Sequence, residues 1–152
     1  QPLDLAPGLA PMPTPFGESD KLSHESFLRA ATALINDQGY RGASVERIST
    51  LLGVTKGAFY HHNETRDGLV VACFERTFAI IREAQDLAMS EQMDGMAHVA
   101  AAAVSLVSRQ ILPEGALLRT SALTSIGPEL RREMEQRLAA STWRFADMLN
   151  DG

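Results

Sequence analysis

Side chains that can donate hydrogen bonds to phosphates and base edges gather in one stretch, LLGVTKGAFYHHNETRDGL, at residues 51–69. Lys56 and Arg66 are its cations, and a tyrosine and two adjacent histidines add further donors. Residues 41–66 hold four Arg or Lys against two Glu, although the whole chain has a formal net charge of -5. Because phosphate binding is driven by clustered Lys and Arg, this pattern predicts a local contact with nucleic acid rather than non-specific coating.

Two short helices joined by a tight turn would position this stretch. Ser44 is a candidate N-cap of the first helix, and Gly53 supplies its left-handed end. The buried face that we expect consists of Ile48, Leu51 and Leu52. Thr55 is a candidate N-cap of the second helix, KGAFYHH. This is the pattern of a helix-turn-helix, whose second helix presents its N-terminal residues to the major groove.

The rest of the chain is also predicted to be helical. Residues 1–20 carry five prolines and predict a flexible lead-in. Ser23 can cap a first helix, which Gly39 would end, and its apolar face is expected to hold Phe27, Leu28, Ala31, Leu34 and Ile35. A long helix is expected over residues 66–90. No strand-like alternation appears, so the fold class is all-α, with three short N-terminal helices feeding a bundle of about four longer ones.

The C-terminal half repeats the helical pattern. A fifth helix is expected to bury one face that comprises Met96, Val99, Ala103, Leu106 and Val107. Pro113 interrupts the pattern, residues 114–126 are predicted to continue it, and a last helix begins with Pro128 in its first turn. Charged residues at three- and four-residue spacing predict a solvated face on this last helix, with Glu129, Arg131, Arg132, Glu133, Glu135 and Arg137.

Composition excludes several classes of protein. No apolar run approaches the roughly 20 residues that a spanning helix needs, and the Pro-rich start at Gln1 does not look like a secretory signal. The single cysteine, Cys73, excludes an intramolecular disulfide and is interpreted as a buried small hydrophobe, so a reducing cytoplasm is the simplest setting. His61 and His62 have no third metal ligand in reach, and no catalytic motif is present. We therefore expect no enzyme, no metal and no cofactor.

The run FLRAATALINDQGYRGASVERISTLLGVTKGAFYHHNETRDGLV resembles the N-terminal DNA-binding domain of the tetracycline-repressor (TetR) family of bacterial transcription regulators. The resemblance lies in the alanine-rich first helix, the Gly-Tyr stop, the Gly-Val-Thr-Lys-Gly turn and the aromatic-Tyr pair. It covers about 45 residues. Two positions depart from the family pattern: Asn63 stands where a Phe is usual, and Arg66 where a Lys is usual.

The resemblance implies a homodimer that binds a palindromic operator, usually as a repressor, and whose remaining helices form an effector pocket and a dimer interface. Carried over to this sequence, the implied DNA contacts are Ser44, Thr55, Lys56, Gly57, Ala58, Tyr60, His61 and Arg66. The implied domains are a helix-turn-helix domain at 21–66 and a helical effector-binding and dimerisation domain at 67–152. The last helix resembles the family's seventh, so we expect the final helices to be lacking.

A small apolar or amphipathic effector is the expected partner besides double-stranded DNA. Candidate pocket residues are Met93, Met96, His98, Ser105 and Trp143. A simpler alternative is that the Met and Trp side chains belong to the core, and that His98 faces solvent. For the whole chain, the alternative function is a helical interaction module or co-regulator whose DNA-binding helices no longer bind DNA, which Asn63 and the acidic balance keep open.

Overall fold

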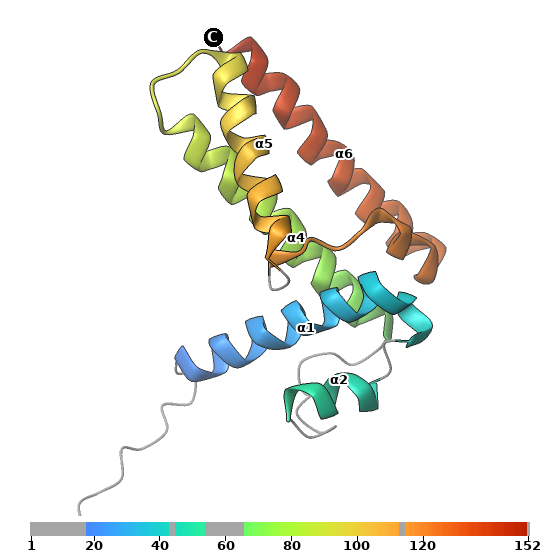
Figure 1. Cartoon of the computed structure of the whole chain (residues 1–152). Helices are drawn as coiled ribbons and strands as arrows, with labels where there is room; N and C mark the ends of the chain where they lie inside the picture. The colour runs from blue at the N-terminus through green and yellow to red at the C-terminus, as the bar shows by residue number, and fades with distance from the viewer. Residues whose placement is uncertain (1–17, 43–44, 54–65, 113–114, 152) are drawn as a thin grey trace, which may run out of the picture.

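The computed structural model describes residues 18–42, 45–53, 66–112 and 115–151. Every regular element within these ranges is helical, which confirms the all-α prediction. The elements are α1 (Glu18–Gly42), α2 (Val45–Leu52), α4 (Arg66–Met89), α5 (Gly95–Ile111), the 3-10 helix η2 (Thr120–Ser125) and α6 (Pro128–Asn150). We call α1 and α2 the head, and α4, α5, η2 and α6 the body. In Figure 1, α1 crosses one end of α4, α2 lies beneath α1, and α4, α5 and α6 pack side by side.

The apolar face predicted for the first helix is the face that α1 buries. Its five residues are all at most 8% exposed: Phe27, Leu28, Ala31, Leu34 and Ile35. The helix begins at Glu18, five residues before the expected cap Ser23. Gly39 leaves the helical region with φ 70° and ψ 169°, so the glycine stop predicted from the sequence is confirmed. A residue with a Cβ would be strained at this φ.

One hydrophobic core joins the head to the body. Phe27 of α1 and Ile48 of α2 belong to the same cluster of buried side chains as Phe74 of α4, Ile126 after η2 and Met134 of α6. The buried residues of α4 recur at short intervals and therefore share one side of the helix. That side contacts both the head and the rest of the body, and it consists of Leu69, Val70, Cys73, Phe74 and Phe78. Burial of this shared apolar surface fixes the head against the near end of α4.

A much smaller cluster closes the far end of the body. Its buried members are Ala88, Ala102 and Met148, from α4, α5 and α6. The C-terminal end of α6 lies beside the start of α5 there (Figure 1). Small side chains let the three helices approach closely, but they remove little apolar surface from water. The far end therefore depends on close backbone packing rather than on a large core.

The face predicted for the fifth helix is wrong. Within α5 the buried residues are Gly95, His98 and Ala102, whereas Met96 is 68% exposed and Val107 is 63% exposed. Ala103 is exposed too, and Val99 and Leu106 are half-buried. The physical reason is close packing: α5 turns its smallest residues toward α4 and α6, and the larger apolar side chains lie outward.

The chain between α5 and α6 differs from the prediction of a continued helix over 114–126. Residues 116–119 are extended, and only the short 3-10 helix η2 follows before α6. The backbone groups that a helix would have satisfied are bound by side chains of other helices instead, as described below. The described residues therefore contain three long body helices, where the sequence predicted about four. Pro128 does occupy the first turn of α6, as predicted.

The solvated face predicted for α6 is confirmed at five positions, and only Arg131 is half-buried. Glu129, Arg132, Glu133, Glu135 and Arg137 are exposed. Arg131, however, donates from Nε to the carbonyl oxygen of Leu123 at 3.1 Å. The guanidinium of Arg137 lies 5.1 Å from the ring centre of Phe78 and binds Glu75. Both arginines act as clamps across helices because their long stems reach neighbouring elements.

Candidate nucleic-acid interface and effector region

Most of the predicted DNA contacts lie outside the described residues. This holds for Ser44, Thr55, Lys56, Gly57, Ala58, Tyr60 and His61, and also for Asn63. Arg66 is described as the first residue of α4, without its side chain. The structure consequently describes the scaffold that precedes and follows the predicted recognition helix, not the helix itself.

The described part of the scaffold has the features that a helix-turn-helix needs. Ile48 on α2 is fully buried, and Ser49 beside it is 5% exposed, so this face of α2 packs against α1. A small residue such as Ser49 lets two helices cross closely. Gly53 follows α2 with φ 64°, the left-handed conformation predicted for it, and its N–H donates to the carbonyl oxygen of Thr50 at 3.3 Å. The turn therefore begins as the sequence predicted.

The outer face of α2 is polar and is tied to α1. Glu46 and Arg47 are exposed, and the Arg47 guanidinium donates to Oε1 of Gln38 on α1. Thr50 donates from its hydroxyl to the carbonyl oxygen of Glu46 at 2.7 Å. The Arg47–Gln38 contact joins α2 to α1, whereas the Thr50 hydrogen bond lies within α2. A reading unit needs rigidity, because base-edge contacts depend on a fixed approach to the groove.

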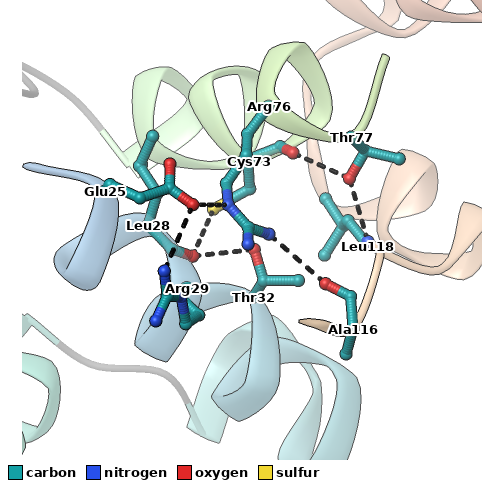
Figure 2. A network of polar contacts seen from close by, with 9 residues as sticks. All are labelled: Glu25, Leu28, Arg29, Thr32, Cys73, Arg76, Thr77, Ala116 and Leu118. Carbon is teal, nitrogen blue, oxygen red and sulfur yellow. Dashed lines mark hydrogen bonds and ion pairs between the residues drawn. The ribbon is translucent and has the colours of Figure 1, made fainter. Parts of the chain in front are cut away.

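Arg76 links the head to the body through buried polar contacts. Its Nε donates to Oε1 of Glu25 on α1 at 2.8 Å, and its Nη1 donates to the carbonyl oxygen of Ala116 at 3.3 Å. The side chain of Arg76 is only 5% exposed, whereas that of Glu25 is 42% exposed. Figure 2 shows the guanidinium reaching from α4 toward both partners. One side chain thus connects α1, α4 and the segment before η2.

Two further polar residues complete this connection. Thr77 donates to the carbonyl oxygen of Cys73 at 3.0 Å and accepts from the N–H of Leu118 at 3.0 Å (Figure 2). Asn36 of α1 donates to the carbonyl oxygen of Leu117 at 2.8 Å and accepts from the N–H of Arg119 at 2.9 Å. Side chains of α1 and α4 therefore satisfy the extended backbone of 116–119. A shift of the segment 116–119 would change its hydrogen bonds to α1.

The sequence reasoning missed Arg76, Thr77 and Asn36. A signal was present in α4, where buried positions recur every three or four residues and Thr77 falls at one of them, between Cys73 and Ile80. A polar residue at a core position needs a partner, and this need predicts a contact. The identity of that partner was not predictable, because the segment 116–119 was expected to be helical.

Cys73 is fully buried, as predicted. Its Sγ lies 3.8 Å from the carbonyl oxygen of Leu28 on α1. Burial raises the pKa of the thiol to about 11, although the side-chain interaction with Thr32 and the charge of Arg76 both oppose the rise. A protonated, buried thiol is a poor nucleophile. The residue therefore serves packing between α1 and α4.

The structure does not bring the five candidate effector residues together. Met93 and Ser105 line a small cavity of about 190 Å³ between α4 and α5, with Leu87 and Ala88. Met96 is 68% exposed, and Trp143 is 71% exposed. Trp143 is nine residues from the buried Met134, which places it on the opposite side of α6. Met96 and Trp143 do not line this cavity.

His98 is buried at 5% exposure, so the alternative in which it faces solvent is wrong. Its Nε2 lies 2.9 Å from the carbonyl oxygen of Glu91, so Nε2 carries the proton in this contact. Nδ1 is buried and has no hydrogen-bond partner within the part of the chain that the structure describes. The histidine ties the start of α5 to the turn after α4. It does not line the small cavity.

No group of three or more His, Cys, Asp or Glu side chains in the described part of the chain could hold a metal ion. No helix among those described has the length and apolar character to cross a membrane.

Comparison with known proteins agrees with the fold. Residues 27–73 match the family model of the bacterial regulatory proteins of the tetR family. The Transposon Tn10 TetC protein of Escherichia coli is 36% identical over 64 residues, which are 42% of this chain and 32% of TetC. The uncharacterized HTH-type transcriptional regulator YwcC of Bacillus subtilis (strain 168) is 40% identical over 52 residues, 34% of this chain and 23% of YwcC. The matched segments thus span about a third or less of each relative.

Two solved structures have a similar fold. The TetR family transcriptional regulator PfmR from Thermus thermophilus superposes with a TM-score of 0.62 at 21% identity, over 83% of this chain and 69% of PfmR. A second solved structure, described as the molecular basis for control of antibiotic production by bacterial hormones, superposes with a TM-score of 0.58 at 21% identity. The superposition covers 86% of this chain and 82% of the chain in that structure.

The fold and the N-terminal segment define the class: an all-helical protein with an N-terminal helix-turn-helix domain and a helical body. Within this class, residues 27–73 match the N-terminal segment of the bacterial regulatory proteins of the tetR family. The resemblance stated from the sequence is thereby confirmed.

Proposed function

We propose that this chain is a cytoplasmic, sequence-specific DNA-binding transcriptional regulator, which represses from a palindromic operator as a homodimer and responds to a small effector. The observation that carries the proposal is the tetR-family match over residues 27–73, on a head whose α2 ends at Gly53 with φ 64°. Regulators of this family are generally non-enzymatic, and the proposal assigns no catalytic residue.

In this proposal, the residues after Gly53 form the reading surface. Thr55, Lys56, Tyr60 and His61 face the major groove, and Gly57 and Ala58 keep the backbone close to it. Ser44 and Arg66 hold phosphates on either side. These roles follow from the family pattern and from the positive charge of this segment. The acidic body would limit non-specific binding.

The test is a titration of operator DNA across salt concentrations. Lys56→Ala and Arg66→Ala are each expected to weaken binding and to lower the slope of log affinity against log salt by about one, because each removes one phosphate-neutralising charge. Arg132→Ala is the matched control, since Arg132 is an exposed arginine on α6, far from the head in sequence. Unchanged slopes in both variants would contradict the assignment. Failure of the folded chain to retain DNA at low salt would favour the interaction-module alternative.

The contacts of Arg76, Thr77 and Asn36 support an effector response. They join the segment 116–119 of the body to α1 of the head. An effector shifts a conformational equilibrium only by its difference in affinity for the two states. We propose that the effector favours one position of this segment, and that α1 and the reading surface follow.

An exposed apolar stripe on α5 is the surface that we propose for the homodimer. It comprises Met96, Ala100, Ala103, Val104, Val107 and Ile111, which fall within about 100° of one another on the helix. Of these, Met96, Val104, Val107 and Ile111 are each at least 63% exposed. No residue from 95 to 108 carries a formal charge when histidine is neutral.

The stripe is self-complementary in an antiparallel pair of α5 helices. A twofold axis beside Ala103 would place Met96 against Ile111 of the second copy and Ala100 against Val107 of the second copy, so large residues meet smaller ones. Covering a patch of roughly 500 Å² on each copy would bury about 1,000 Å² in total, which is the lower limit for a specific interface. Association would then bury apolar residues of α5, such as Met96 and Val107, that were predicted to lie in the core but are exposed in the single chain.

Val107→Glu is expected to raise the dimer dissociation constant by at least about tenfold, because a carboxylate would be placed on the stripe against apolar side chains. Sedimentation equilibrium over a range of concentrations measures this constant. Ala139→Glu, which adds the same charge at an exposed position of α6, is the control and should leave the constant unchanged. Equal dissociation constants for Val107→Glu and the unsubstituted chain would refute the stripe as the dimer surface.

A further inference from the structure

A cleft of about 570 Å³ lies in the angle between α1 and α4 and reaches the last turn of α5. This volume is within the roughly 300–1,000 Å³ of typical small-molecule sites. None of the candidate effector residues lines it. Its position is unlike that of the small α4–α5 cavity, since one wall belongs to the head and the other walls belong to the body.

Three guanidinium groups from three different helices line the cleft: Arg29 of α1, Arg76 of α4 and Arg109 of α5. Of the carboxylates that line it, Glu75 is paired with Arg137 of α6 at 3.2 Å. The other two are Glu25 and Glu83, so three arginines line the cleft beside two glutamates that Arg137 does not pair with. Within the described residues Arg109 makes no ion pair. The cleft is therefore suited to an anion.

Arg29 has an unmet hydrogen-bonding demand at this cleft. Its Nε is buried and finds no hydrogen-bond partner among the described residues. Its Nη2 lies 3.8 Å from Oε1 of Glu25, which is beyond hydrogen-bond distance. The same oxygen of Glu25 lies closer to Nε of Arg76, at 2.8 Å, so Glu25 is shared by the two arginines (Figure 2). The Arg29 side chain as a whole is 42% exposed, so its guanidinium is accessible from the cleft. A carboxylate is the acceptor whose geometry fits a guanidinium best.

The remaining lining is apolar. Leu28 of α1 and Ala72, Ala79 and Ile80 of α4 supply a hydrocarbon surface beside the charged groups. We propose that the cleft binds a small amphipathic carboxylate: the carboxylate accepts from Arg29, Arg109 adds a second positive charge, and the hydrocarbon part lies on Leu28 and Ile80. This assigns a ligand class and a location at the junction of head and body.

The regulatory consequence rests on the proposed DNA-binding function. A ligand held between Arg29 of α1 and Arg109 of α5 stabilises the arrangement of head and body in which both can contact it. If operator binding needs another arrangement, the carboxylate lowers the affinity for DNA by its difference in affinity for the two states. Ligand binding itself needs no DNA and can be measured without it.

The experiment uses octanoate as the probe, with octylamine and octanol as matched compounds of the same chain length. Isothermal titration calorimetry on the chain without DNA is expected to show saturable binding of octanoate at one site per chain and none of octylamine. Arg29→Gln and Arg109→Gln should each weaken octanoate binding by roughly tenfold, the effect of losing one charge-assisted contact. Arg132→Gln, at an exposed position of α6, should leave it unchanged.

Several results would overturn the proposal: no binding of octanoate, equal binding of octylamine or octanol, or unchanged octanoate affinity in both Arg29→Gln and Arg109→Gln. Arg109 is exposed on α5, so its substitution tests the site without disturbing the core. A chain that binds octanoate as expected but retains no operator DNA would contradict the proposed function and leave the cleft assignment supported. The two failures are therefore distinguishable.

Discussion

Replacing Gly95 by valine is expected to destabilise the far end of the body by about 3 kcal/mol. A Cβ built on Gly95 would lie 2.4 Å from the carbonyl oxygen of Leu149 and 2.7 Å from that of Met148. Both atoms belong to the backbone of α6, so no side-chain rotation relieves the overlap. The start of α5 must move away from the end of α6, and the small cluster of Ala88, Ala102 and Met148 loses its packing.

Amide hydrogen exchange can locate this effect as well as measure it. Protection should fall for the first turns of α5 and the last turns of α6, while α1 and the near end of α4 keep theirs, because the large core lies at the other end of the body. Gly127→Ala is the matched control. A Cβ there would be 3.7 Å from Oδ2 of Asp67, an ordinary contact, so a loss of at most about 1 kcal/mol is expected at this N-cap position. Equal losses in the two variants would contradict the close-packing argument.

Parts of the fold could be predicted from the sequence, whereas the close packing at Gly95 could not. Features that depend on local sequence were predicted: the apolar face of α1, the left-handed Gly39 and Gly53, and Pro128 at the start of α6. Each is determined within a few residues by side-chain periodicity or by backbone sterics. They needed no knowledge of which helices meet.

The inward face of α5 depends on long-range packing, and its prediction failed. By hydrophobicity alone, Met96 and Val107 should lie inside. The helix instead turns Gly95 and Ala102 inward, because only small residues permit its close approach to α4 and α6. The extended segment 116–119 was missed for a similar reason. Its backbone is satisfied by Asn36 and Thr77, which lie 81 and 41 residues away along the chain.

The candidate sites also differ in whether local sequence or tertiary structure determines them. The DNA-contact residues come from a sequence pattern and lie outside the described residues, so the fold adds to them only the scaffold around Gly53. The cleft between α1 and α4 could not be predicted from the sequence, since Arg29 and Arg109 are 80 positions apart in the numbering and meet only through the crossing of three helices. Local motifs therefore predicted the reading unit, and tertiary structure revealed how it is joined to the body.

Arg76→Ala is expected to lower the free energy of unfolding by about 2 kcal/mol, because it removes a buried stem and leaves the carbonyl oxygen of Ala116 without its donor. The contact with Glu25 contributes less than its 2.8 Å length suggests, since the Glu25 side chain is 42% exposed and screened by water. Urea unfolding measures the loss as a lower midpoint at unchanged slope.

Arg82→Ala is the control one turn and a half further along α4. Arg82 is an exposed arginine in an ion pair with Asp86 at 3.6 Å, so its removal should cost well under 1 kcal/mol. Equal losses in the two variants would show that Arg76 contributes no more than a surface charge. If Arg76 does join the parts, its substitution should also increase amide exchange in α1, whose contacts through Glu25 depend on it, and Arg82→Ala should not. A loss of stability without faster exchange in α1 would mean that the shared apolar core alone holds the head to the body, and that the polar contacts do not transmit a signal between them.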